Sequence, residues 1–256
     1  MRYPHLYSYF DRKIHYYKFK YAANKADLVI AISEQTKKDI VTYLKINPHK
    51  IKVIYQGCAP VFKEEIPIEF IELTRKKYQL PSDFILNVGT IEKRKNVLSV
   101  IKAIKEIDTQ LVVIGKKTVY FKEVNNYIVE NNIQNKVIFL ENVELRELAS
   151  IYRMASVFIY PSVFEGFGIP IIEALYSKTP VITSKGGCFS EAGGENTVYI
   201  DPLNTEEIKG ELEEILANSE KRELMKQKGF EFVQKFNDDI IAKNWVETYN
   251  EVLRLY

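Results

Sequence analysis

Two glutamates stand eight positions apart in the segment PSVFEGFGIPIIEAL, which covers residues 161–175. Glu165 comes just before a Gly-Phe-Gly turn, and Glu173 follows it after Pro170. A carboxylate at Glu173 can accept two hydrogen bonds from the neighbouring hydroxyls of a ribose. The carboxylate of Glu165, before the turn, can face the group attached beyond the phosphates of a nucleotide. The pair therefore points to a nucleotide site.

The residues around the glutamates predict a strand, a turn and a helix. The run SVFIYPS at 156–162 is typical of a strand, and IPIIEAL begins a helix with Pro170 near its first position, where the missing N–H costs nothing. Glu173 is then expected in the first turn of that helix. A turn after a parallel strand lies at the carboxyl edge of the sheet, where open α/β sheets bind ligands.

Backbone N–H groups in the turn are a second expected binding element. At a helix N-terminus such groups bind phosphate, and glycines let a ligand approach closely because they carry no side chain. The expected donors are Gly166, Phe167, Gly168 and Ile169. A glycine-containing turn also occurs without function, and a glutamate near a helix start can simply complement the helix dipole. The combination of both glutamates with this turn favours a site.

Alternating strand and helix patterns extend over most of the chain and predict a parallel, doubly wound α/β sheet, because each parallel crossover needs a returning element. Continuous apolar runs such as LVVIG fit strands buried on both faces. The expected strands are 84–89, 110–115, 136–141, 156–162, 180–184 and 197–200, and the expected helices lie around 97–106, 119–131, 145–154, 169–176 and 205–217.

A different block precedes this region. Residues 27–31 and 50–55 are predicted strands, and Ser33 is a predicted N-cap for the helix EQTKKDIVTYL. The segment QGCAPVF suits a linker. The last residues, DDIIAKNWVETYNEVLRLY, predict an amphipathic helix of nearly twenty residues.

Composition narrows the function classes. The net charge of +2 gives no general reason to expect nucleic acid as a partner. The two cysteines have no CxxC spacing and the three histidines form no ligand cluster, so we expect no metal site and a reducing cytoplasmic location. No run of residues resembles a membrane span or a secretion signal.

Residues 1–25 are basic and rich in aromatic side chains, with Asp11 as the acidic residue. Such a segment can lie on an anionic membrane surface. It can equally be an amphipathic helix that packs on its own domain, since long charged side chains often cover the edge of a core. Both interpretations stay open for the sequence alone, and His5 is expected to pack or to face solvent.

The motif EGFGIPIIE resembles the E-x(7)-E motif of the retaining, nucleotide-sugar-dependent glycosyltransferases of family 4, called group 1, which have the GT-B fold of two Rossmann-like domains. The similarity extends to NVGTIEKRKNV at 87–97, to ITSKGGCFSEAGGENTVYIDPLN at 182–204 and to ADLVIAISEQTKKDI at 26–40. It covers nearly the whole chain. The resemblance implies that residues 1–57 are the end of an N-terminal acceptor domain with a linker, and that residues 58–236 are the nucleotide-sugar-binding domain. Residues 237–256 are then a helix that returns to the N-terminal part.

The resemblance also implies roles for individual residues. Glu165 is expected near the transferred sugar and Glu173 on the nucleotide ribose. Lys95 occupies the diphosphate-binding lysine position in the basic segment EKRKN, which alone would equally suit a solvated run of charges. The family often has an arginine directly after the glycine of the first strand, but here Thr90 follows Gly89. Arg94 is therefore the expected second cation, and both Gly89 and Thr90 are expected at the donor.

The chemistry agrees with these roles. Breaking a glycosyl–phosphate bond places negative charge on the leaving diphosphate, so cations and helix N–H groups aimed there stabilise the transition state more than the ground state. An arginine and a lysine can do this without a divalent ion, and no Asp-x-Asp metal triplet occurs. No metal and no cofactor are therefore expected.

The expected function is transfer of a sugar, with retention, from a nucleotide sugar to a glycan or lipid-linked acceptor in polysaccharide biosynthesis. The early strands of the family's acceptor domain have no counterpart here, so this chain is expected to be mainly the donor-binding half. Two alternatives stay open: a non-catalytic nucleotide-sugar-binding module that needs a partner subunit, and a sugar-nucleotide epimerase of the same fold. A dehydrogenase is disfavoured because no GxGxxG follows the first strand.

Overall fold

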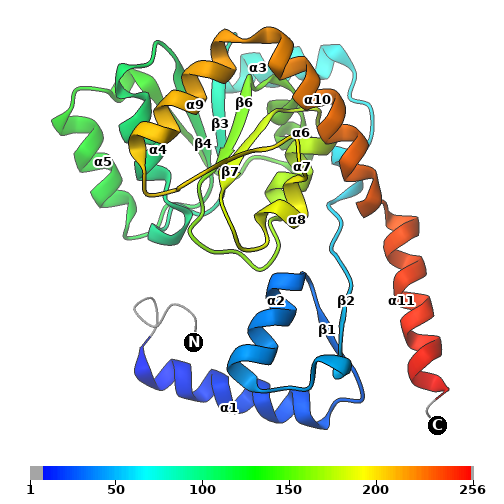
Figure 1. The fold of residues 1–256 in the computed structure, drawn as a ribbon. Coiled ribbons are helices and arrows are strands. Elements are labelled where there is room, and N and C mark those ends of the chain that lie inside the picture. The colour runs from blue at the N-terminus through cyan, green and yellow to red at the C-terminus, as the bar shows by residue number, and fades with distance from the viewer. Residues whose placement is uncertain (1–7, 255–256) are drawn as a thin grey trace. The chain divides into compact units, whose positions relative to one another are not determined.

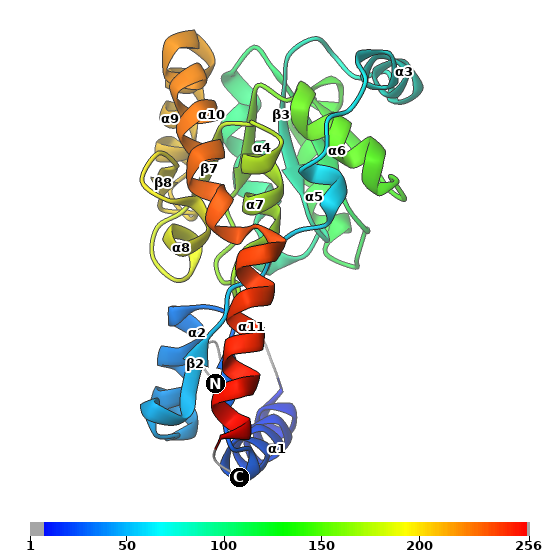
Figure 2. The same ribbon diagram turned by 90° about the vertical axis from the view of Figure 1, so that its right-hand side faces the viewer.

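The computed structural model describes residues 8–254 of the chain (Figure 1). His5 and the first seven residues of the basic N-terminal segment therefore lie outside the described part. The chain forms two compact units. Unit 1 contains the described residues of 1–57 and 235–256, and unit 2 contains residues 58–234. Figure 2 shows the same elements after a turn of 90°.

Unit 2 is built on a six-stranded parallel sheet with the order β5-β4-β3-β6-β7-β8. This confirms the predicted α/β class and each of the six predicted strands of this region. The strands are β3 (Phe84–Val88), β4 (Gln110–Ile114), β5 (Val137–Leu140), β6 (Val157–Tyr160), β7 (Val181–Ser184) and β8 (Val198–Ile200).

Helices cover both faces of this sheet (Figure 1). Alternate residues of the strands, such as Val157 and Ile159 of β6, pack with α4, α5 and α9 in one core. Phe158 lies between them on the opposite face and contacts Tyr152 of α6. The helices are α3 (Ile68–Tyr78), α4 (Val97–Ala103), α5 (Phe121–Glu130), α6 (Leu145–Met154), α7 (Ile169–Tyr176), α8 (Phe189–Gly193), α9 (Thr205–Ala217) and α10 (Ser219–Val233).

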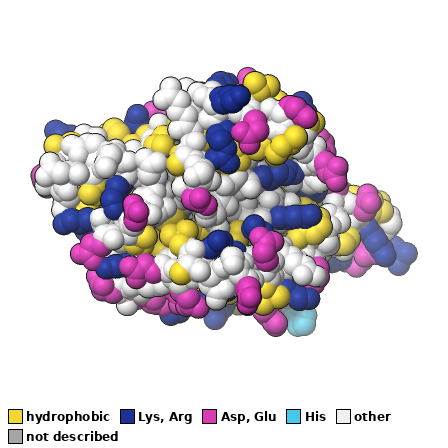
Figure 3. Space-filling model, turned by 90° about the horizontal axis from the view of Figure 1, so that it is seen from above, with side chains coloured by type: hydrophobic (Ala, Val, Ile, Leu, Met, Phe, Trp, Pro, Cys, Tyr) yellow, Lys and Arg dark blue, Asp and Glu magenta, His cyan; other side chains and the backbone are white. Residues whose placement is uncertain are grey.

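The burial of the strands explains their continuous apolar sequences. All residues of β6 and β7 are buried, as expected for central strands covered on both sides. The outer surface carries many charged side chains. Seen from above, basic and acidic side chains are interspersed over it (Figure 3), which matches the net charge of +2.

Unit 1 contains a short parallel pair, β1 (Val29–Ala31) and β2 (Ile51–Val53). Ser33 caps α2 (Glu34–Asp39) by accepting from the Thr36 N–H, as predicted. The predicted helix does not continue regularly, because residues 40–44 form a π-helical turn that ends at Lys45 in the left-handed conformation. The unit is completed by α1 (Tyr9–Lys25) and α11 (Asp238–Leu253). Within residues 8–254, no helix has the length and hydropathy needed to cross a membrane.

Candidate functional site

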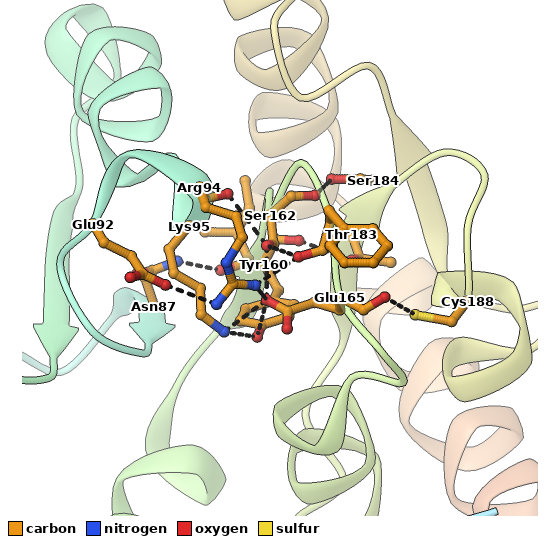
Figure 4. Close-up of polar contacts among 12 residues, drawn as sticks. Asn87, Glu92, Arg94, Lys95, Tyr160, Ser162, Glu165, Thr183, Ser184 and Cys188 are labelled. Carbon is orange, nitrogen blue, oxygen red and sulfur yellow. Dashed lines mark hydrogen bonds and ion pairs between the residues drawn. The ribbon is translucent and has the colours of Figure 1, made fainter. Parts of the chain in front are cut away.

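The site lies at the point where the order of the strands in the parallel sheet reverses. β3 and β6 are neighbours, and the strands that follow each of them extend the sheet in opposite directions. Their crossovers therefore leave the carboxyl edge on opposite faces and open a crevice there, which is the usual ligand position in doubly wound folds. The basic segment follows β3 and the glutamate turn follows β6, so the strand order brings both to this point (Figure 4).

Glu165 is the centre of a compact polar cluster. Its Oε1 atom lies 2.7 Å from Arg94 Nη1 and 2.7 Å from Lys95 Nζ. The same oxygen accepts hydrogen bonds from the hydroxyls of Tyr160, at 2.8 Å, and Ser162, at 2.7 Å. Figure 4 shows these side chains converging from the two loops and from the end of β6. The structure thus brings together three residues predicted from sequence, Arg94, Lys95 and Glu165.

The electrostatics of the cluster keep Glu165 ionised. Burial alone would raise the pKa of its carboxyl, but the ion pair with Lys95, the hydrogen bond from Ser162 and the charge of Arg94 lower that pKa below its ordinary value. The Tyr160 hydroxyl behaves in the opposite way. Burial and the neighbouring Glu165 charge raise its pKa, so it remains a proton donor.

Both cations are held by more than the carboxylate. Arg94 Nη1 also lies 2.6 Å from the Phe164 carbonyl oxygen, and its Nη2 lies 2.7 Å from Glu92 Oε1. The Lys95 ammonium sits over the ring of Tyr160, 4.8 Å from the ring centroid, and donates to the Tyr160 hydroxyl. Side chains with this many fixed partners lose little further freedom when a ligand binds.

The backbone after β3 passes close to the backbone after β4. The Gly89 N–H donates to the Ile114 carbonyl at 2.9 Å, and a methyl group added at Gly115 would lie 2.0 Å from the Gly89 carbonyl oxygen. Gly89 itself has φ +146°, a conformation that favours glycine. Thr90 follows Gly89 and is partly buried. Within residues 8–254, no hydrogen bond joins Thr90 to the Glu165 cluster.

The turn between Glu165 and α7 has the predicted form. Gly168 is the N-cap residue of α7 with φ +113°, and Pro170 lies in the first turn. Ile169 is the first helical residue, so its N–H has no acceptor within the helix. Gly166 precedes the buried Phe167, whose side chain packs inward with 2% exposure. The two glycines carry no side chain and Phe167 is buried, so these three residues leave the turn without an exposed side chain.

Glu173 lies deeper than the sequence predicts. It is the fifth residue of α7, and no acidic residue occupies the first turn of that helix, so the expected first-turn position is wrong. The helix begins at Ile169, as expected, but a turn takes 3.6 residues, so the first turn is complete at Ile172 and Glu173 begins the second. Its Oε2 accepts from the Tyr152 hydroxyl at 3.1 Å. Burial raises the pKa of Glu173 to about 7, and the Tyr152 hydrogen bond only partly offsets this.

Several polar residues of the site were missed by the sequence reasoning. Tyr160 and Ser162 donate to Glu165, and the Cys188 thiol donates to its backbone carbonyl at 3.3 Å. Asn87 donates from β3 to the Ile159 carbonyl of β6 at 2.8 Å and so ties the two central strands together. For Tyr160, Ser162 and Asn87 the signal in the sequence was a polar group at or near the end of an otherwise apolar strand.

The described residues contain no group of three or more His, Cys, Asp or Glu side chains that could hold a metal ion. The charged groups of the site include the cations Arg94 and Lys95 and the carboxylates Glu165 and Glu173. Cations beside a helix N-terminus suit a diphosphate, and a carboxylate suits hydroxyl groups. The arrangement can therefore bind a molecule that combines both.

Comparison with known proteins identifies glycosyltransferase families over most of the chain. The family described as "Glycosyl transferases group 1" matches residues 70–232, and that described as "Glycosyltransferase Family 4" matches residues 2–60. The uncharacterized glycosyltransferase MJ1178 of Methanocaldococcus jannaschii is 31% identical over 92% of this chain and 63% of its own length. The O-antigen chain mannosyltransferase RfbU of Salmonella typhimurium is 31% identical over 73% of this chain and 51% of its own.

Solved structures show the same fold. A glycosyltransferase from Rickettsia africae superposes with a TM-score of 0.83 at 22% identity, over 92% of this chain and 67% of that one. Anabaena Alr3699/HepE in complex with UDP-glucose superposes with a TM-score of 0.85 at 19% identity, over 97% of this chain and 69% of that one. The chain spans about half to two thirds of the length of the relatives with which it is compared.

Proposed function

Because this chain belongs to the glycosyl transferases of group 1, we propose that it takes part in transferring a sugar from a nucleotide-sugar donor to an acceptor. The observation that carries the proposal is the Glu165 cluster at the switch point of the sheet, where Arg94 and Lys95 converge on one carboxylate. A site with two fixed cations beside a helix N-terminus fits a diphosphate, and a neighbouring ionised carboxylate fits a sugar.

Arg94, Lys95 and the N-terminus of α7 are assigned to the diphosphate of the donor. The developing negative charge on this leaving group is stabilised by cations that are already in place, so little reorganisation accompanies bond breaking. Gly89 and Thr90 lie on the segment that leads into the two cations. We propose that this set works without a divalent metal.

The two glutamates are assigned to opposite ends of the donor. Glu165 faces the transferred sugar, where an ionised carboxylate accepts hydrogen bonds from hydroxyls and stabilises positive charge on the reacting carbon. Glu173 accepts from the ribose hydroxyls. In this assignment the reaction proceeds with retention, as the resemblance of the EGFGIPIIE motif implies.

Unit 2 is then the nucleotide-sugar-binding domain and unit 1 corresponds to the end of an acceptor domain. Curated relatives carry the names O-antigen chain mannosyltransferase and capsular polysaccharide biosynthesis glycosyltransferase. We accordingly assign this protein a glycan or lipid-linked acceptor in polysaccharide biosynthesis. Its place of action is assigned to the cytoplasm, at the inner face of the membrane.

The test is titration of the chain with UDP, GDP and dTDP and with their sugar conjugates. We expect one nucleotide family to bind with a Kd in the micromolar-to-millimolar range, about −4 to −8 kcal/mol, with and without EDTA. Loss of binding on EDTA addition would contradict the metal-free assignment. Absence of binding to any nucleotide, by a folded chain, would refute the proposed function.

A transfer assay addresses the acceptor side. Positioning of the acceptor accounts for several kcal/mol of a transfer barrier, and the chain spans only part of the length of its relatives. We expect donor binding but negligible transfer by these 256 residues, and transfer when a complete acceptor domain is present. Robust transfer to saccharide or lipid acceptors by this chain alone would place the acceptor site within it.

A further inference from the structure

The segment that carries Arg94 and Lys95 is anchored at its start. The N–H of Ile91 donates to the Lys116 carbonyl at 2.9 Å, and the Ile91 carbonyl accepts from the Thr118 hydroxyl at 2.5 Å. Ile91 is therefore fixed to the segment that follows β4. The two cations come three and four positions later in a short 3-10 turn, so their positions depend on what holds the other end of this segment.

Asn96 holds that other end. The residue is 8% exposed. Its Nδ2 donates to the Pro202 carbonyl at 2.5 Å and, more weakly, to the Pro161 carbonyl at 3.4 Å. Its Oδ1 accepts from the Ser99 hydroxyl at 2.8 Å. Pro161 directly follows β6 and Pro202 lies two residues after β8, so one buried amide joins three loops at the carboxyl edge of the sheet.

A helix cap does not account for this side chain. Asn96 is the N-cap residue of α4, yet its side chain makes no capping hydrogen bond to that helix. Its backbone is left-handed, with φ 58°. Glycine, asparagine and aspartate adopt this conformation most readily. Among the three, only asparagine has a side chain that donates hydrogen bonds, which the two proline carbonyls require.

The same segment is bound to the turn that carries Glu165. The Arg94 carbonyl accepts from the Val163 N–H at 2.9 Å and from the Ser162 hydroxyl at 3.3 Å. Together with the Asn96 amide, these bonds hold the cation segment against this turn at two places. The backbone contact therefore fixes the cations relative to Glu165 before a ligand arrives.

We propose that Asn96 is a positioning residue for the donor diphosphate, acting through Arg94 and Lys95. This role rests on the proposed function and extends it to a residue outside the Glu165 cluster. Without the Asn96 amide, the second end of the segment would be free to move, and binding would have to order it again. Part of the favourable interaction of the two cations with the diphosphate would then be lost.

Calorimetric titration of Asn96→Gly with UDP, GDP and dTDP tests the proposal. Glycine accepts the left-handed backbone, so the substitution removes the amide without straining the chain. The nucleoside diphosphate that wild type binds most tightly should bind about tenfold more weakly, the factor expected when about one residue must be ordered again on binding. Ser99→Ala is a milder second variant, because it keeps the amide and loses only the hydroxyl that orients it. It should weaken binding about two- to fivefold.

Repeating Asn96→Gly in a Lys95→Ala background separates positioning from a merely structural role. If the amide acts through the cations, the two effects are coupled. The glycine substitution should then weaken binding by no more than about threefold, since only Arg94 is left to misplace. A tenfold loss in both backgrounds would overturn the proposal. So would an unchanged Kd in Asn96→Gly, or in Ser99→Ala if the glycine variant does not fold.

Asn132→Gly is the matched control. Asn132 has nearly the same backbone conformation, with φ 55°, and is exposed in the turn after α5. This substitution should leave nucleotide affinity within about twofold, and a loss equal to that of Asn96→Gly would count against the proposal. A folded wild-type chain that binds none of the three nucleotides refutes the proposed function and this role together. Wild-type binding that Asn96→Gly leaves unchanged refutes the role of Asn96 alone.

Discussion

The clearest consequence of the site geometry is a pH dependence of donor binding set by Glu173. This side chain is partly buried in α7, and burial raises the pKa of its carboxyl to about 7. Ribose hydroxyls donate hydrogen bonds, so the ionised carboxylate is the form that binds them best. Ionisation is complete above the raised pKa and is lost as the pH falls through it. Affinity should therefore rise with pH between about 6 and 8.

The size of this effect follows from the fraction of Glu173 that is ionised. With a pKa of about 7, that fraction falls roughly tenfold between pH 8 and pH 6. If binding requires the carboxylate, the association constant falls by the same factor, which is about 1.4 kcal/mol. In Glu173→Gln the charge is absent at every pH. Its affinity should be about ten- to a hundredfold lower at pH 8 and nearly independent of pH.

The assay is calorimetric titration with a nucleotide sugar across this pH range. A nucleotide sugar is preferable to a nucleoside diphosphate, because a terminal phosphate group itself titrates near pH 6. Histidines do not interfere within unit 2, since the three histidines of the chain are His5, His15 and His49. Wild-type affinity that is constant between pH 6 and 8, or the same pH dependence in Glu173→Gln, would refute the reasoning.

Three further predictions concern the cluster and its support. Lys95→Ala and Arg94→Ala should each weaken nucleoside diphosphate binding about ten- to a hundredfold, because each loses a charge-assisted hydrogen bond; unchanged titrations for both would remove these residues from the site. Gly115→Ala should lower the free energy of unfolding by about 1–3 kcal/mol, since its new methyl group meets a backbone carbonyl, and equal urea midpoints would contradict that close approach. Tyr160→Phe should leave diphosphate binding within about twofold but lower the transfer rate of a transfer-competent version of the protein about tenfold, because it removes one neutral donor from the Glu165 carboxylate; an unchanged rate would make the hydroxyl structural only.

The predicted positions of strands and helices in unit 2 were confirmed because their signals are local. Buried parallel strands need continuous apolar runs. The helices between them need an apolar residue at every third or fourth position, which together form one apolar face. Ser33 was recognised as an N-cap for a similarly local reason. The turn at Gly168 and Pro170 also follows from backbone preferences of those two residue types.

What the sequence by itself determined was therefore the alternation of elements, the turn before α7 and the residue types that can bind a nucleotide sugar. The tertiary structure decided which of them meet. Arg94 and Lys95 reach Glu165 from about seventy positions away only because β3 and β6 are neighbours in the sheet. Strand order depends on packing of the whole domain, which no local pattern encodes. The depth of Glu173 beside Tyr152, and with it the raised pKa, depends on the same long-range packing.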